Sequence, residues 1–316
     1  MKELQDRERE NLIKIAYWYY KRHMTQAEIA KRLGFTRQKV NQLIGSLVDL
    51  GIVEININGL EADFAELEFA IEKKFKLKQV RIVEADSDSL EDFGKKAAET
   101  INNFFEGNQI IGLSWGTTLG ATIGCIKPIQ LKNSTVVQMV GGLNSESAMV
   151  RPDEIARSLA QKLNCGLHIL YAPAFVASHE AREFILQERS VAEGIDLIKK
   201  CDIALLGVGE LKESSTVSRE GFMPREMLHD LLKDGFVGDI AMIPFKKDGT
   251  WKDNGNVIGI DGETLKKIPN VVIICKGAEK TNAVIGAIHT GCVDTVIIDK
   301  EIALEIAKQY KLVKER

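Results

Sequence analysis

The chain lacks several features that would place it in common classes of protein. Its five cysteines include no CxxC pair, which argues against a disulfide scaffold or a zinc site and favours reduced thiols. No apolar run approaches the ~18–20 residues that would cross a bilayer, and the charged start MKELQDRERENL contains no readable signal peptide. We therefore expect a cytoplasmic protein without a membrane partner.

Motifs for common cofactors are also missing. The sequence contains no GxGxxG fingerprint and no Walker lysine, and its histidines and cysteines never occur at HxxxH or CxxC spacing. We expect neither a metal nor another cofactor. At 316 residues, with 45% hydrophobic and 28% charged residues, the composition is that of an ordinary globular chain of about two domains.

Net charge is low, but it is unevenly distributed along the chain. Residues 1–58 hold 10 Lys and Arg against 7 Asp and Glu, a balance of +3. Residues 59–316 hold 32 against 38, a balance of −6, so the whole chain carries −3. A small basic segment on a larger acidic one favours a nucleic-acid partner for the first part only.

The first 58 residues carry the pattern of a small helical domain. Apolar residues at helical spacing predict a helix over residues 8–22. Thr25 and Glu28 form a capping-box sequence that opens a second helix, which Gly34 ends. Thr36 then caps a third helix that has one apolar face.

Two short helices joined by a glycine turn form the helix-turn-helix arrangement, and the alternating run Ile52–Ile57 predicts the edge strand of a wing. Polar residues that open the last helix can enter a major groove, where Arg reads guanine and Asn or Gln reads adenine. An ordinary three-helix subdomain is the alternative, but the cap, the glycine turn, the amide-rich helix and the positive charge coincide. The residues predicted to contact double-stranded DNA are Thr25, Gln26, Thr36, Arg37, Gln38, Lys39, Asn41 and Gln42, with Arg22, Lys31 and Arg32 beside them for phosphates.

Residues 59–316 alternate apolar strands with helices. Near-continuous apolar strands separated by helices are typical of a parallel sheet covered on both faces, so the fold class is α/β and Rossmann-like. We therefore predict one domain at residues 1–58 and a second at residues 59–316. The predicted strands are Gln79–Glu84, Gln109–Ser114, Thr135–Val140, Leu167–Tyr171, Ile203–Val208, Asp239–Ile243, Val271–Cys275 and Thr295–Ile298.

The residues that follow each strand are the candidate ligand site, because ligands of open α/β sheets bind outside the carboxyl ends of the strands. Gly116, Thr117 and Thr118 follow one strand and open a helix, which describes a phosphate cradle or a structural turn with threonine caps. Lys280 lies near another helix start, where a cation is unfavourable unless an anion is bound. Asp239 could accept two sugar hydroxyls or cap a turn. The candidate residues for this ligand site, the effector-binding residues if the protein is a regulator, are Ser114, Gly116, Thr117, Thr118, Gly141, Gly207, Gly209, Asp239 and Lys280.

With these residues identified, the whole chain resembles the SorC family of bacterial transcriptional regulators. The resemblance rests on motifs that occur in the family's order: TQAEIAKRLGFTRQKVNQLIGSLVDLGIVEI, IIGLSWGTTL, VVQMVGG, IALLGVG, VGDI, AEKTNAVIGAI and TVIIDKEIA. It implies a winged helix-turn-helix domain and a sensor domain similar to the sugar-phosphate isomerase and deaminase fold. It also implies a homodimer or homotetramer and a phosphorylated sugar as effector. The residues that it implies for this effector are Gly116, Thr117 and Thr118 at the phosphate, Asp239 at the sugar hydroxyls, and Lys280 at the anion or a sugar oxygen.

The sequence departs from the family at two places. The usual Ser-Arg pairs of the recognition helix become Thr36-Arg37 and Asn41-Gln42, which makes any borrowed operator sequence doubtful. Val140 precedes the glycine pair, so no lysine is available there for a Schiff base and we expect a non-covalently held effector.

The alternative function is a sugar-phosphate isomerase or deaminase with a helical extension. Such an enzyme needs a general acid and base, and the candidates are few. His289 is better interpreted as a packed or C-terminal-turn histidine, and His168 as the start of a strand. His179 and Glu180 are better interpreted as the first turn of a helix. We therefore expect no catalytic residues and a DNA-binding regulator of carbohydrate catabolism that responds to a phosphorylated sugar.

Overall fold

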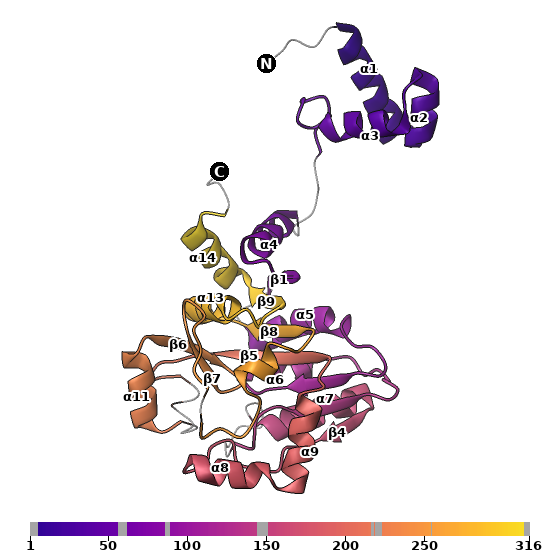
Figure 1. Cartoon of the computed structure of the whole chain (residues 1–316). Helices are drawn as coiled ribbons and strands as arrows, with labels where there is room; N and C mark the ends of the chain where they lie inside the picture. The colour runs from indigo at the N-terminus through magenta and orange to yellow at the C-terminus, as the bar shows by residue number, and fades with distance from the viewer. Residues whose placement is uncertain are drawn as a thin grey trace. The chain divides into compact units, whose positions relative to one another are not determined.

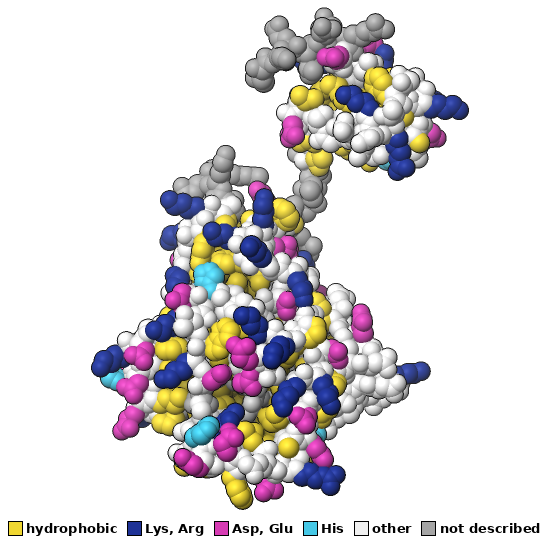
Figure 2. Space-filling model, in the orientation of Figure 1, with side chains coloured by type: hydrophobic (Ala, Val, Ile, Leu, Met, Phe, Trp, Pro, Cys, Tyr) yellow, Lys and Arg dark blue, Asp and Glu magenta, His cyan; other side chains and the backbone are white. Residues whose placement is uncertain are grey.

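The protein has two compact units in a computed structural model that describes residues 6–55, 62–85, 89–143, 151–215, 218, 223–253 and 255–312 (Figure 1). The units are Met1–Ala62, called the head below, and Asp63–Arg316, called the body. Basic and acidic side chains are interspersed on the face of each unit that Figure 2 shows. The predicted domain boundary at residue 58 falls within residues 56–61, outside the described part.

The head consists of short helices around a small core. Thr25 and Thr36 cap two of these helices as predicted, and Gly34 ends the first of the two in a left-handed conformation, with φ of 67°. The predicted first helix is confirmed, although its last turn widens into a π-helix. The elements are α1 (Asp6–Ala16), η1 (Tyr17–Lys21), α2 (Gln26–Leu33) and α3 (Arg37–Ser46), and the core contains Leu12, Ile15, Ile29, Val40, Ile44 and Leu47.

The predicted wing strand is wrong where the structure describes it. Residues 52–55 form no strand, and Asn56 and Ile57 lie outside the described residues. The N–H groups of Ile52 and Val53 both donate to the carbonyl oxygen of Leu47, at 3.0 and 3.2 Å. These bonds fold the segment back on the end of α3, where Ile52 and Val53 pack partly buried against the helices and Ile55 stays exposed, so the alternating pattern corresponds to no strand pairing.

The body is built on a parallel sheet, as the apolar strands predict. Seven parallel strands run in the order β1-β9-β8-β5-β2-β3-β4. Every residue of β8 and β9 is buried, which requires both faces of the sheet to be covered. The strands are β1 (Gln79–Val83), β2 (Ile110–Leu113), β3 (Thr135–Gln138), β4 (Gly166–His168), β5 (Ile203–Glu210), β8 (Val271–Cys275) and β9 (Thr295–Asp299).

Helices surround this sheet (Figure 1). They are α4 (Ala62–Phe75), α5 (Leu90–Asn102), α6 (Thr117–Gly124), α7 (Pro152–Leu163), α8 (His179–Leu186), α9 (Arg189–Ile198), α11 (Arg225–Lys233), α12 (Gly262–Leu265), α13 (Thr281–His289) and α14 (Lys300–Tyr310), with the 3-10 turn η3 (Ala278–Lys280) before α13. Among the described residues, no helix is long and apolar enough to span a bilayer.

One predicted strand, Asp239–Ile243, is instead two. β6 (Phe236–Ile240) and β7 (Ile243–Lys246) form an antiparallel hairpin, and β6 pairs with the end of β5. The two residues between them, Ala241 and Met242, both have left-handed conformations, with φ of 50° and 66°. Positive φ at both central positions is the geometry of a type I′ turn, which normally has Gly or Asn at these positions. Neither residue is present here, so the sequence gives no sign of the turn.

Candidate functional site

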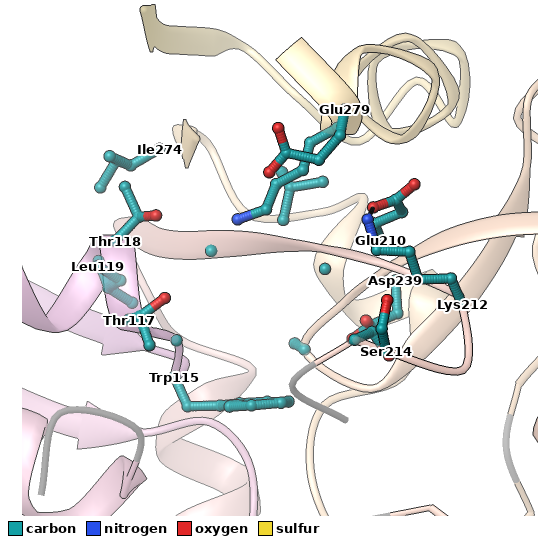
Figure 3. Close-up of a pocket in the computed structure, with 17 residues that line it drawn as sticks. Trp115, Thr117, Thr118, Leu119, Glu210, Lys212, Ser214, Asp239, Ile274 and Glu279 are labelled. Carbon is teal, nitrogen blue, oxygen red and sulfur yellow. Dashed lines mark ion pairs between the residues drawn. The ribbon is translucent and has the colours of Figure 1, made fainter. Parts of the chain in front are cut away.

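A cavity of about 380 Å³ opens at the carboxyl ends of β2, β5 and β8, on the edge of the sheet where the sequence predicts a ligand. Thr117 and Thr118 lie on one side of it, and Glu210 and Asp239 on the other, with the Trp115 ring along its base (Figure 3). Its volume is within the ~300–1,000 Å³ of small-molecule sites. Seven of the nine candidate effector-binding residues line it: Gly116, Thr117, Thr118, Gly207, Gly209, Asp239 and Lys280.

Backbone groups form one side of the cavity. Gly116 precedes α6 with φ of 132° and ψ of 151°, a conformation that residues with a Cβ rarely adopt, and no side chain caps the helix there. The first N–H groups of α6 and the positive end of its dipole are therefore available to an anion. A Cβ on Gly207 would lie 2.7 Å from the Trp115 carbonyl oxygen, so that glycine lets β5 approach this loop.

A buried carboxylate forms the opposite side. Asp239 is 2% exposed, and one of its oxygens, Oδ2, accepts the Met242 N–H at 3.2 Å. The other oxygen, Oδ1, is buried without a hydrogen-bond partner among the described residues. Burial raises the pKa of Asp239 to about 6, although the Met242 N–H acts against the increase. Asp239 therefore caps the hairpin turn and also offers an unused acceptor beside the cavity.

Glycine makes room for this carboxylate. Gly209 pairs with Asp239 across β5 and β6, and a Cβ at Gly209 would collide with Asp239 Oδ1. Gly207 and Gly209 thus have specific steric roles at the cavity.

The charged side chains of the cavity are of both signs. Lys280 lines it and forms no ion pair with any residue in the described ranges. Lys212 and Glu210 form an ion pair with each other, while Glu279 lies above the cavity in Figure 3. Lys280, as a cation, and the positive end of the α6 dipole are therefore the groups that would attract an anionic ligand.

Two of the candidate residues do not line the cavity. Ser114 is buried behind it, where its hydroxyl accepts the Gly207 N–H at 3.2 Å and so ties β2 to β5. Gly141 lies elsewhere: its N–H donates to the Ile258 carbonyl oxygen at 2.9 Å, and a Cβ there would meet the Pro173 carbonyl oxygen at 2.6 Å. A close approach of two loops thus explains the glycine at 141.

Several lining residues were missed in the sequence. Trp115, which is 8% exposed, directly follows Ser114, and Glu210 directly follows Gly209. Their place beside the predicted site could be read from the sequence, but not that their side chains face the cavity. Ala241 lies in the β6–β7 turn and Glu279 in η3, neither of which the sequence revealed, and Lys212 and Ser214 lie in the segment that follows β5.

The structure agrees with the interpretations of His179 and His289 and corrects the placement of His168. His179 and Glu180 open α8 behind the cap Ser178, and hydrogen bonds from the Glu180 backbone and Ser178 lower the pKa of Glu180. His289 ends α13, where its Nδ1 lies 2.8 Å from the Lys247 carbonyl oxygen. His168 ends β4 rather than starting a strand.

The described residues contain no group of three or more His, Cys, Asp and Glu side chains that could hold a metal ion. All five cysteines are free thiols, and burial raises the pKa of Cys201 and Cys275 to about 12. Their thiols are therefore protonated at neutral pH and poor nucleophiles.

The start of α3 is exposed in the head. Thr36 accepts the Lys39 N–H at 3.1 Å, while the side chains of Arg37, Gln38 and Lys39 are exposed. The capping box of α2 is complete, because the Thr25 N–H donates to the Glu28 carboxylate at 2.8 Å and the Glu28 N–H donates back to the Thr25 hydroxyl. Both helices thus begin with a hydrogen-bonded cap at the surface predicted to meet DNA.

Side chains of this surface are held in place across helices. Gln26 of α2 donates to the Asn41 side-chain oxygen of α3 at 3.0 Å, which leaves the Asn41 amide group free to donate. The guanidinium groups of Arg22 and Arg32 lie 5.6 Å from the ring centres of Tyr17 and Trp18. This stacking restrains two cations near the predicted recognition helix.

Comparisons with known proteins cover both units. Residues 62–308 match the Sugar-bind family model, which describes a sugar-binding domain, and residues 18–58 match a model of the MarR family. The sorbitol operon regulator of Klebsiella pneumoniae is 25% identical over 301 residues, which are 92% of this chain and 96% of that protein. The chain belongs to the SorC family of sugar-binding-domain regulators.

Other relatives of this SorC-family chain are similar over nearly their whole length. The deoxyribonucleoside regulator of Bacillus subtilis is 26% identical over 306 residues, or 94% of this chain and 97% of that protein. The transcriptional regulator LsrR of Escherichia coli K12 is 26% identical over 313 residues, or 95% of each. The crystal structure of full-length SorC from Klebsiella pneumoniae shares the fold, with a TM-score of 0.74 at 24% identity over 95% of this chain and 99% of that one.

A DeoR-family regulator from Listeria monocytogenes also matches, with a TM-score of 0.71 at 28% identity over 77% of this chain and 98% of that one. Because these relatives are transcriptional regulators, the SorC-family chain is a DNA-binding regulator of transcription and not an enzyme. The isomerase or deaminase alternative is therefore wrong.

Proposed function

We propose that the chain binds operator DNA of a carbohydrate-catabolism operon through α3 of its head, and that a phosphorylated sugar in the body cavity modulates this binding. The cavity carries the proposal, because it pairs an anion-binding helix start with a buried carboxylate acceptor. A phosphate would accept hydrogen bonds from the first N–H groups of α6 and meet Lys280. A sugar hydroxyl would donate to Asp239 Oδ1 and satisfy it.

The DNA-binding side chains are assigned by their exposure at the start of α3. Arg37, Gln38 and Gln42 would meet base edges, and Lys39 would meet phosphates. Thr25, Gln26, Thr36 and Asn41 would set the position of α2 and α3 and add backbone contacts. An operator with two-fold symmetric half-sites would be bound by a homodimer or homotetramer. The protein would act in the cytoplasm, and it would be a repressor if sugar binding releases it from DNA.

Effector binding is tested by tryptophan fluorescence, since Trp115 lines the cavity. Glucose 6-phosphate, fructose 6-phosphate, fructose 1,6-bisphosphate and ribose 5-phosphate form the panel, and the matching unphosphorylated sugars are the controls. At least one phosphorylated sugar should bind, and Thr118→Val should weaken it. Equal binding of a sugar and its phosphate would contradict the assignment of the phosphate site.

DNA binding is tested with a duplex selected from a random library by the full-length protein. Affinity should fall steeply with salt, because contacts to phosphates release counterions. The phosphorylated sugar that binds should change the operator dissociation constant, whereas its unphosphorylated counterpart should not. The proposed function is wrong if the protein selects no duplex, or if no sugar phosphate changes its affinity for the operator.

A further inference from the structure

Two adjacent residues at the end of β9, Asp299 and Lys300, contact different parts of the body. Asp299 is the last residue of β9 and the N-cap of α14, and Lys300 is the first residue of that helix. The side chain of Asp299 bonds to the loop that carries Lys280. The side chain of Lys300 contacts the first turn of α4.

Asp299 holds the loop through its carboxylate. It is 3% exposed, and its Oδ2 accepts the Gly277 N–H at 2.6 Å while its Oδ1 accepts the Ile302 N–H at 3.0 Å. One buried carboxylate therefore joins the start of α14 to residues 276–280. A hydrogen bond to a buried charge is stronger than one between neutral groups, so this link is firm.

The loop has an unusual conformation and room beside it. Gly277 has φ of 108° and ψ of 123°, which other residues rarely adopt. Lys280 lines the effector cavity at one end of the loop. A second cavity of about 210 Å³ borders the loop and is lined by Lys276, Asp299 and Lys300. The loop therefore has open space on the side of Lys276.

Lys300 holds the first described turn of α4. Its ammonium group lies 2.7 Å from a Glu84 carboxylate oxygen at the end of β1, and 5.5 Å from the centre of the Phe64 ring. Phe64 is the third residue of α4, the element that follows residues 56–61 and hence the head in the chain. The Lys96 ammonium also donates to the Glu84 carbonyl oxygen at 2.6 Å, which fixes the end of β1.

We propose that Asp299 and Lys300 are positioning residues that couple the effector cavity to α4, and through α4 to operator binding. The proposal rests on the proposed function. A phosphate that attracts Lys280 would shift the loop. The hydrogen bond from the Gly277 N–H would then displace the Asp299 carboxylate. Lys300 directly follows Asp299 in the chain, so a displacement of Asp299 would change the contacts of Lys300 with Glu84 and Phe64. Such coupling requires that the ligand favour one of two arrangements of these contacts.

The test measures the operator dissociation constant of the full-length protein with and without the tightest-binding member of the sugar-phosphate panel. Their ratio is the coupling factor, typically about 5–150 for a regulator. Lys300→Met keeps the length of the side chain but removes the cation. It should lower the factor by about two- to fivefold, because an exposed ion pair and a cation–aromatic contact are each weak. The sugar-phosphate affinity and the operator affinity without ligand should stay within about twofold of wild type, a difference below 0.5 kcal/mol.

Two further variants keep the outcome decisive. Lys199→Met removes a similar ion pair, with Asp196 on α9, and should leave the coupling factor unchanged. Lys300→Arg retains a cation and should preserve coupling. Asp299→Asn loses the charge that Gly277 bonds, so it should weaken sugar-phosphate binding by about threefold or more.

The two levels of failure are distinguishable. A wild-type coupling factor of one with every sugar phosphate refutes the proposed function. The proposal for Asp299 and Lys300, which rests on it, is then refuted as well. A wild-type factor well above one that Lys300→Met leaves unchanged overturns the proposal alone. Equal losses in Lys300→Met and Lys199→Met also overturn it, since the effect would then be one of net charge.

Discussion

The buried carboxylate of Asp239 predicts how the stability of the body depends on pH. One oxygen caps the β6–β7 turn and the other has no partner among the described residues. Replacement by asparagine removes the buried charge but keeps an oxygen for the Met242 N–H. We expect Asp239→Asn to stabilise the protein above neutral pH and to weaken sugar-phosphate binding, because the charged acceptor is lost.

The magnitude follows from the raised pKa. Burial raises the pKa of Asp239 to about 6 from its ordinary 3.8, which corresponds to about 3 kcal/mol of lost stability above pH 7. Between these two pKa values the native state holds a proton that the unfolded chain has released. The favourable contribution is therefore complete below about pH 4 and is lost as the pH rises through about 6. Between pH 5 and pH 8 the loss is about 1–2 kcal/mol.

The assay is urea unfolding of wild type and Asp239→Asn at pH 5 and at pH 8, followed by tryptophan fluorescence. Trp115 and Trp251 report on the body, and the signal of Trp18 in the head is common to both proteins. The difference in unfolding free energy between the two proteins should grow by about 1–2 kcal/mol in favour of the variant as the pH rises. Parallel pH profiles would refute the reasoning, because they would show that Asp239 keeps an ordinary pKa in the folded protein.

Three substitutions test the other assignments. Gly116→Ala should cost about 1–3 kcal/mol of stability through backbone strain at φ of 132° and abolish phosphate binding, and an unchanged melting temperature would contradict this. Thr25→Ala removes the capping box, so it should destabilise the head by about 0.5–2 kcal/mol in thermal unfolding by circular dichroism and weaken operator binding. Arg37→Ala should weaken operator binding by about 1–3 kcal/mol in a gel-shift titration and leave sugar-phosphate binding intact, whereas loss of both would indicate misfolding.

Much of the fold was readable because local chemistry and tertiary structure agree. The capping box at Thr25 and the left-handed Gly34 are determined by neighbouring residues, so both are visible in the sequence. The central strands were predicted well because β8 and β9 are buried on both faces and hence uniformly apolar.

The errors lie where distant segments decide the structure. Ala241 and Met242 form the β6–β7 turn without glycine or asparagine, so the hairpin had no sequence signal. Gly141 is required by the approach of residue 173, which no local pattern reveals. Asp239 was equally compatible with a turn cap and a ligand acceptor, and the structure shows why: its two oxygens have different surroundings.

The turn at Ala241 and Met242 has a consequence for directed evolution of this protein. Left-handed conformations cost residues other than glycine about 1–2 kcal/mol each, so the sensor is less stable than its topology permits. Selection for heat resistance alone should therefore return glycine or asparagine at these two positions. Selection that also demands a response to sugar should resist such changes at Ala241, which lines the cavity, and accept them at Met242.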